Sequence, residues 1–137
     1  MTTVTTRAEI ARQAQDAPKD ARQIVGFSFY CVDPAWRRLP RATRAKQSGE
    51  LVALLNRFKS KLMVRTYSLV GLKGGVEFLI WRVGRSIEAV QEISAELRQT
   101  TMAGYLTMPF TYLSMTKRST YVDKIDPDHQ DRRRFIT

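Results

Sequence analysis

The N-terminal half of the sequence contains two apolar patterns of different period. Residues 24–32 read Ile-Val-Gly-Phe-Ser-Phe-Tyr-Cys-Val, a run of β-branched and aromatic residues that is typical of a strand. Within residues 41–60, Leu51, Leu55 and Phe58 recur at intervals of four and three, which places them on one face of a helix. Because this face is apolar, we expect the helix to lie on a sheet.

A hairpin is predicted next. Residues 62–70 and residues 76–83 have the composition of strands, and residues 71–75 between them contain three glycines. Glycine adopts the positive φ angles that tight turns require, so these glycines are expected to supply them.

A second helix is predicted to begin at Ser86, whose hydroxyl is placed to cap the first turn. Its apolar stripe consists of Ile87, Val90, Ile93 and Leu97, which follow helical spacing. This helix is therefore expected to bury one face as the first helix does.

A fourth strand is expected over residues 110–114, because the alternation starts after Pro109 and proline cannot donate to a strand ladder. The resulting order is β-α-β-β-α-β. This order predicts an α+β, ferredoxin-like unit, in which two helices cover one face of a four-stranded antiparallel sheet.

The other face of the predicted sheet has no helix to cover it. We expect Phe27, Phe29, Val64 and Trp81 on this face, where they would form an apolar patch of a size uncommon on monomers. The sheet is therefore expected to pack against a second sheet and close an α+β barrel, from two chains or from two halves of one chain.

Composition divides the chain into three segments. Residues 1–21 are expected to form a polar N-terminal arm, residues 22–124 the ferredoxin-like domain, and residues 125–137 a polar tail or the start of a missing second half. No apolar stretch approaches the ~20 residues that a membrane-spanning helix needs, and no signal-peptide core follows the N-terminus. A cytoplasmic location without membrane contact is expected.

The net charge of +10 raises nucleic acid as a partner. The basic residues are scattered and are not interleaved with aromatic side chains as in single-strand stacking platforms, so nucleic-acid binding ranks last among the hypotheses.

Four further side chains have ordinary structural interpretations. Cys31, the only cysteine, lies in an apolar run and is expected to act as a small core residue. Trp36 is interpreted as a core or interface anchor. Arg82 and Arg85 flank the end of a predicted strand and are expected to face solvent.

Four blocks of the sequence carry a family resemblance. Residues 27–40, 65–72, 78–82 and 112–122 occur in the order found in the N-terminal half of the chlorite dismutase-like superfamily, which includes chlorite dismutases and coproheme decarboxylases. The resemblance covers about residues 22–124.

In that family a subunit has two ferredoxin-like halves packed as a barrel, and subunits commonly form pentamers. The resemblance implies that haem is held by a proximal histidine of the second half, so that this chain would bind haem only with a second half or partner subunit. The single histidine, His129, lies in the polar tail and is interpreted as a solvated linker residue rather than an axial ligand. No metal site is therefore expected in this chain, and catalysis by it alone is not expected.

The resemblance also implies roles for several candidate site residues. In coproheme decarboxylases of one bacterial group, a Ser-x-x-x-x-Ser-x-Tyr pattern ends in a tyrosine beside a haem propionate, and Ser114, Ser119 and Tyr121 reproduce its spacing. Tyr121 is the candidate catalytic residue, since a phenol can donate a hydrogen bond or be oxidised; an ordinary strand-end tyrosine is the alternative. Lys117, Arg118 and Ser119 are candidates for binding tetrapyrrole carboxylates, with plain surface charge as the alternative.

Two classes of function remain open. The first is the N-terminal half or a subunit of a haem oxidoreductase, with peroxide-dependent coproheme decarboxylation or related oxyanion or peroxide chemistry completed by a haem-binding second half. The second is a non-catalytic ferredoxin-like structural or interaction subunit that lacks haem and closes its sheet as a homodimer.

Overall fold

The computed structural model describes residues 22–117 and residue 125 of the chain. Its elements follow the predicted order, with two short helical segments added. In chain order they are β1 (Ile24–Val32), α2 (Pro34–Arg37), α3 (Arg41–Phe58), β2 (Met63–Ser68), β3 (Phe78–Gly84), α4 (Ile87–Arg98), the 3₁₀ helix η1 (Thr101–Tyr105) and β4 (Leu106–Met115).

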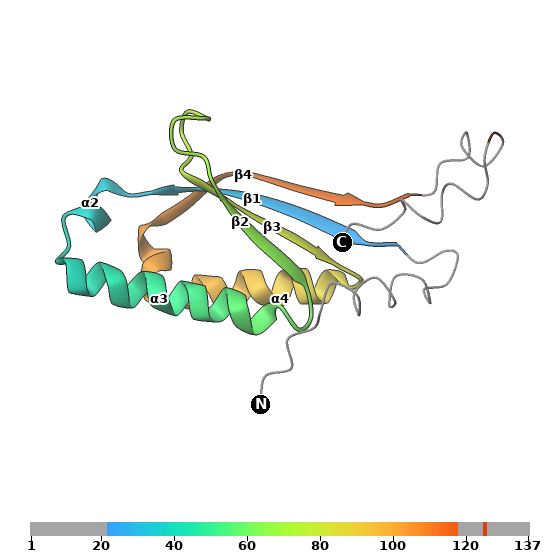
Figure 1. The fold of residues 1–137 in the computed structure, drawn as a ribbon, viewed down its shortest axis with the longest axis horizontal. Coiled ribbons are helices and arrows are strands. Elements are labelled where there is room, and N and C mark those ends of the chain that lie inside the picture. The colour runs from blue at the N-terminus through green and yellow to red at the C-terminus, as the bar shows by residue number, and fades with distance from the viewer. Residues whose placement is uncertain (1–21, 118–124, 126–137) are drawn as a thin grey trace.

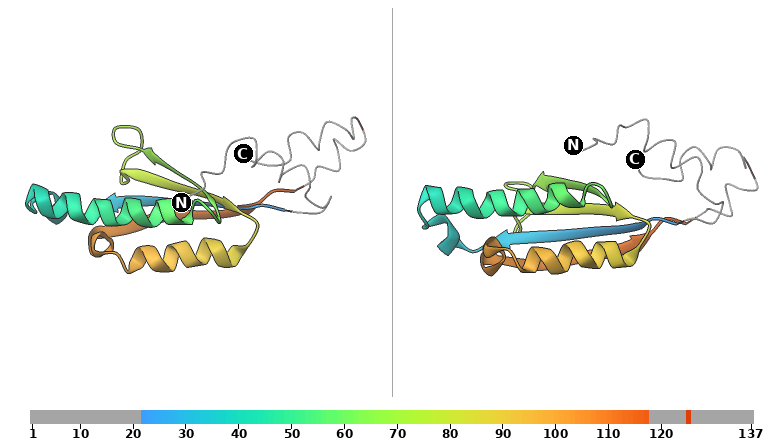
Figure 2. Two further views of the ribbon diagram at one scale, coloured as in Figure 1. Left: turned by 60° about the horizontal axis from the view of Figure 1, so that its bottom comes forward. Right: turned by 90° about the horizontal axis from the view of Figure 1, so that it is seen from below.

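The four strands form one antiparallel sheet in the order β2-β3-β1-β4. The long helices α3 and α4 lie side by side on the same face of this sheet (Figures 1 and 2). Helix α3 contacts β2, and α4 contacts β1 and β3. The predicted ferredoxin-like α+β unit is confirmed for the described residues.

Strand β4 is longer than the sequence predicted, and Pro109 lies inside it. Phe29 pairs with Phe110 and Cys31 pairs with Thr107, so the register shifts and two residues of β4 face a single residue of β1. Such a bulge on an edge strand leaves a position that needs no ladder donor, which accommodates a proline. The expectation that the strand starts only after Pro109 is wrong for this reason.

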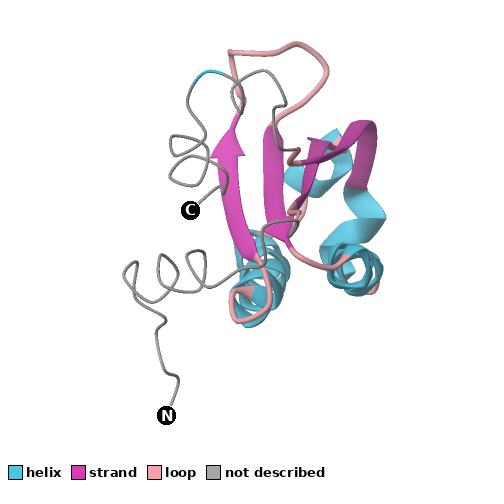
Figure 3. Cartoon of the chain, turned by 90° about the vertical axis from the view of Figure 1, so that its right-hand side faces the viewer, coloured by secondary structure: helices cyan, strands magenta, loops and turns pink. Residues whose placement is uncertain are grey.

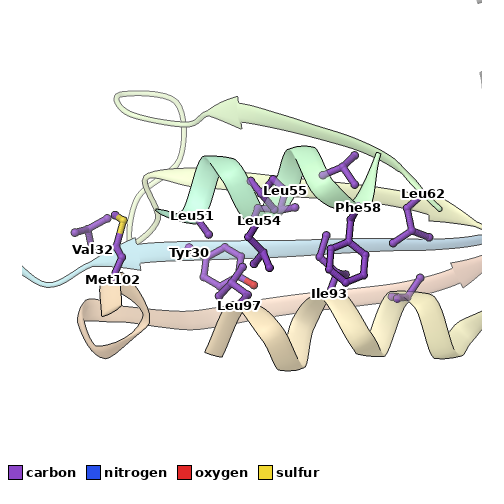
Figure 4. Close-up of a cluster of buried hydrophobic side chains, with 13 residues drawn as sticks. Tyr30, Val32, Leu51, Leu54, Leu55, Phe58, Leu62, Ile93, Leu97 and Met102 are labelled. Atoms are coloured by element: carbon purple, nitrogen blue, oxygen red, sulfur yellow. The ribbon is translucent and has the colours of Figure 1, made fainter. Parts of the chain in front are cut away.

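The core fills the space between the helices and the sheet (Figure 4). The predicted apolar face of α3 is buried, as are Val90, Ile93 and Leu97 of α4. Ile87, the first member of the predicted stripe, is 42% exposed and does not belong to the core. It occupies the first position of α4, where the helix has only begun to cover the sheet.

Polar contacts fix the two helices. The Ser86 hydroxyl accepts a hydrogen bond from the Ala89 backbone N–H, so the predicted cap of α4 is confirmed. An ion pair between Arg57 and Glu96 joins α3 to α4. A second pair, between the Lys61 ammonium and Glu92 at 2.9 Å, joins the segment just after α3 to α4. These pairs are partly exposed, so each stabilises the fold only modestly.

The segment after β1 forms the short helix α2. The Asp33 carboxylate accepts a hydrogen bond from the Ala35 backbone N–H at 2.7 Å, and Pro34 occupies the first turn. Trp36 packs on the core and donates its indole N–H to the Gln47 side chain at 2.8 Å. The interpretation of Trp36 as a core anchor is confirmed.

The loop between β2 and β3 projects from the sheet on the side away from the helices (Figures 1 and 3). Of its three glycines, Gly71 and Gly75 adopt positive φ angles of 76° and 77°, whereas Gly74 does not. The loop places the Lys73 ammonium 5.0 Å from the ring centroid of Phe110 in β4. It therefore arches over the helix-free face of the sheet.

No helix within residues 22–117 is both long enough and apolar enough to cross a membrane.

Candidate functional site

Alternate residues of every strand point away from the helices and form the helix-free face. Its aromatic members come from all four strands, and we call them the aromatic face: Phe27 and Phe29 (β1), Tyr67 (β2), Trp81 (β3), and Phe110 and Tyr112 (β4). Phe27, Phe29 and Trp81 were predicted here. Val64 was predicted here too, but it is buried in the core beneath the helices, so that prediction is wrong.

The rings of the aromatic face contact one another across the strands. Phe27 and Trp81 stack with centroids 5.9 Å apart and an interplanar angle of 6°. Phe29 meets Phe110 and Tyr112 edge to face, at 6.4 and 5.9 Å. Pairs of this kind stabilise neighbouring strands and hold the rings in a fixed arrangement.

Despite these contacts, much of the aromatic face is accessible. Tyr112 is 58% exposed, Tyr67 43% and Phe110 39%. Contiguous exposed aromatic surface of this kind is typical of interaction sites. The basic side chains of Arg65, which pairs with Trp81 in the ladder, and Lys73 add positive charge around it. The arrangement is suited to packing against another protein surface.

Of the predicted site residues, the structure describes Lys117, which lies two residues after the end of β4. The Gln23 backbone N–H donates to the Thr116 hydroxyl at 2.8 Å, and the Thr116 N–H donates to the Gln23 carbonyl at 2.9 Å. These bonds fix the chain just before Lys117, which is exposed. Arg118, Ser119 and Tyr121 lie outside the described residues, as does His129, so their roles remain predictions.

The described residues do not fit a haem site. They include no histidine, and no group of three His, Cys, Asp or Glu side chains among them could hold a metal ion. Cys31 is half-buried on the sheet and is not a core residue as predicted, and its thiol makes a long contact with the Val32 carbonyl at 4.0 Å. An axial ligand is ordinarily held in place by hydrogen bonds from neighbouring groups, and the described residues show no such arrangement.

A polar cluster lies on the opposite, helix-covered side of the sheet. Arg82 is only 5% exposed, which contradicts the expectation that it faces solvent. Its guanidinium donates to the hydroxyls of Ser28 in β1 and Ser94 in α4. Arg82 follows the fully buried Ile80 by two residues in β3, and this period-two relation was the signal in the sequence that could have revealed its burial.

Burial governs the ionisation of this cluster. It raises the pKa of the Tyr30 phenol above its usual value, and the Arg82 charge, a hydrogen bond with Ser28 and the Arg98 charge only partly oppose the rise. Burial also lowers the pKa of the Arg82 guanidinium. Both shifts disfavour charge, as expected for groups removed from water.

Comparison with known proteins identifies the family. The sequence model of chlorite dismutases matches residues 44–136, which is more than half of the chain. The chain belongs to the chlorite dismutase family. Its fold resembles a substituted chlorite dismutase from Candidatus Nitrospira defluvii, with a TM-score of 0.74 and 21% identity over 83% of this chain and 47% of that one.

Two further structures extend the comparison within the chlorite dismutase fold. Another substituted form of the same enzyme matches with a TM-score of 0.71 and 22% identity, over 74% of this chain and 43% of the other. A protein from Thermus thermophilus described as heme-binding matches with a TM-score of 0.62 and 20% identity, over 74% and 47% of the two chains. This family member thus spans less than half the length of the solved chains that it matches.

Proposed function

We propose that this chain is the N-terminal half of a chlorite dismutase-like haem protein, and that its aromatic face packs against the sheet of a haem-binding second half. The observation that carries the proposal is the accessible aromatic face on a unit that spans 43–47% of its structural relatives. Two sheets facing each other would bury these rings and close an α+β barrel. The second half is a later segment of the same polypeptide or a partner subunit, and the assembly is a cytoplasmic oligomer, a pentamer by family resemblance.

The proposed reaction is peroxide-dependent decarboxylation of an iron coproporphyrin, or related haem oxidoreductase chemistry. Haem or the iron porphyrin is held by the second half, because the described residues of this chain supply no axial ligand. Tyr121 is proposed as the catalytic residue that this half contributes, with its phenol beside a propionate group. Lys117, Arg118 and Ser119 would bind the porphyrin carboxylates through ionic and hydrogen bonds.

Native mass spectrometry of the protein purified from its source, with a visible absorption spectrum of the same sample, tests the assembly. We expect the mass of this chain together with a second half, and a Soret band. A colourless monomer with the mass of this chain alone would contradict the proposal.

The role of Tyr121 is tested separately by Tyr121→Phe in the haem-bearing assembly. Decarboxylation of iron coproporphyrin with hydrogen peroxide should fall by roughly 100-fold, a typical loss when a group that transfers a proton or hydrogen in the reaction is removed. Tyr105→Phe is the control, since Tyr105 lies in η1 on the opposite end of β4. Full turnover of the Tyr121→Phe assembly would remove Tyr121 from the proposal.

A second candidate is a structural subunit without haem that closes its sheet as a homodimer. It is favoured by the same aromatic face, which runs across all four strands and can pair with a second copy through a two-fold axis. A colourless homodimer in the native mass spectrum would support this candidate in place of the haem protein.

A further inference from the structure

Within residues 22–117, the buried guanidinium of Arg82 has only neutral hydrogen-bond partners. Its Nη2 group donates to Ser28 and its Nη1 group to Ser94, with the Val90 carbonyl at 3.5 Å as a further, long contact. Its Nε–H is buried and meets no acceptor among the residues that the structure describes. The ion pairs found within residues 22–117 join other side chains and leave Arg82 without a carboxylate.

Such an arrangement is costly for a purely structural arginine. Buried charges in proteins are ordinarily paired, because a neutral hydroxyl compensates only part of the lost hydration. The arginine nevertheless stands on the core side of the central strand β3, where an apolar residue would pack without this cost. The guanidinium therefore lacks a negative charge that an anion could supply.

A cavity of about 150 Å³ lies beside the guanidinium, between α4, η1 and β4. Its polar wall contains Tyr30 and Thr111 in addition to Arg82 and its two serine partners, and exposed Arg98 lies at its edge. Leu97, Leu106 and Met108 form its apolar wall. The cavity thus combines two guanidinium groups with hydroxyl donors and an apolar surface.

A larger hollow of about 530 Å³ continues from this cavity along the groove between α4 and β4. The two share Arg82, Ser94, Arg98 and Thr111 in their walls. The rest of the larger hollow is lined mostly by apolar residues, among them Ile87, the stripe residue that does not enter the core. A ligand with a charged end and an apolar body would match both spaces.

We propose that the cavity beside Arg82 binds a small organic carboxylate, with the carboxylate between Arg82 and Arg98 and its apolar chain along the α4–β4 groove. The planar guanidinium is suited to a carboxylate, which it holds through charge-assisted hydrogen bonds. Ser28 and Ser94, already in contact with the guanidinium, hold it in place. The guanidinium of Arg82 lies on the opposite side of the sheet from the aromatic face, and the groove reaches that face only at Tyr112 of the edge strand. The proposal does not rest on the proposed haem function.

Titration of the full 137-residue chain with hexanoate tests the site, with hexanol as the neutral control of equal chain length. We expect the thermal unfolding midpoint to rise by about 5 °C at saturating hexanoate, since a ligand that binds only the folded state stabilises it. In the NMR spectrum, the Nε–H signal of Arg82 should move with the same affinity. Hexanol and inorganic phosphate should produce neither effect at equal concentration.

Two variants separate binding from folding. Arg98→Ala changes an exposed residue, so the fold should be retained while the affinity for hexanoate falls roughly tenfold, the loss of about one charge-assisted hydrogen bond. Arg65→Ala removes an exposed arginine from the other side of the sheet and should leave the affinity unchanged.

Three outcomes would overturn the proposal. Equal effects of hexanol and hexanoate would mean that the cavity recognises apolar surface only. Equal effects of phosphate and hexanoate would mean that it recognises any anion. A stationary Arg82 Nε–H signal in folded protein at high hexanoate would mean that no carboxylate reaches the guanidinium.

Discussion

The two faces of the sheet differ in how completely the described residues cover them. On the helix side, Ile80 of β3 and Ile93 of α4 are each 1% exposed and belong to one continuous core. On the other side, Tyr112 is 58% exposed although it is part of a network of ring contacts. The described residues pack a core on the helix side, whereas they leave the aromatic face preorganised but uncovered. The comparison assigns the folding stability of this chain to the helix side and the proposed association to the aromatic face of the same strands.

Neighbouring residues of β3 should show this difference most strongly. Ile80→Ala empties a fully buried site and should lower the free energy of unfolding by about 3–4 kcal/mol. Leu79→Ala, on the half-buried aromatic side, should cost only about 1 kcal/mol in the isolated chain. Urea unfolding of the two variants measures the difference, and equal losses would show that both faces are packed within one chain.

The Tyr112→Ala substitution tests the contribution of the aromatic face to stability and to association. The free energy of unfolding of the isolated chain should change by less than about 0.5 kcal/mol, because the ring is largely exposed. Association through this face should weaken by about 30-fold, the effect of losing an aromatic anchor worth about 2 kcal/mol. Sedimentation equilibrium of the assembly measures this change.

Val52→Ala is the matched control for Tyr112→Ala. Val52 is 55% exposed on α3, on the other side of the sheet. Association that weakens as much in this variant as in Tyr112→Ala would mean that the aromatic face is not the contact surface.

Loss of a polar contact on the helix side should give the smallest change in the free energy of unfolding, and this change should be seen only at acid pH. The Glu50 carboxylate accepts hydrogen bonds from the Thr101 backbone N–H at 3.0 Å and from its hydroxyl at 2.8 Å, which join α3 to η1. These bonds lower the pKa of Glu50 in the folded protein. Their stabilisation is therefore present above the unfolded pKa of about 4.5 and is lost as the pH falls through the lower, folded value.

The Glu50→Gln variant should show a slightly weaker dependence of unfolding free energy on pH in this acid range. Urea unfolding between about pH 2.5 and pH 6 measures it. The Thr101→Val variant should lose part of the same dependence, because it removes one of the two donors. Curves that coincide with the unsubstituted protein would show that the contact contributes nothing.

The helix side was largely predictable from the sequence because its signals are local. The spacing of Leu51, Leu55 and Phe58 and the cap at Ser86 each depend on residues within a few positions. Pro109 misled the prediction of β4, because the bulge that accommodates it depends on pairing with β1, which is distant in the chain.

The candidate sites were less predictable for two different reasons. The aromatic face followed from alternation in β1 and β3, but the orientation of Val64 depended on the register between β2 and β3. Arg82 was misplaced because charge normally indicates exposure, and its burial depends on hydroxyls from β1 and α4. The roles of Lys117, Arg118, Ser119 and Tyr121 come from the family resemblance alone and remain predictions.

Hydroxyl-radical footprinting tests the central claim, that the aromatic face is covered in the working protein. The protein purified from its source would be compared with the isolated chain, residue by residue, by mass spectrometry. Tyr112 and Tyr67 should be oxidised several-fold more slowly in the purified assembly, whereas Val52 and Ile87, which have matching exposure on the helix side, should react at unchanged rates. Equal oxidation of Tyr112 and Tyr67 in both samples would contradict the account.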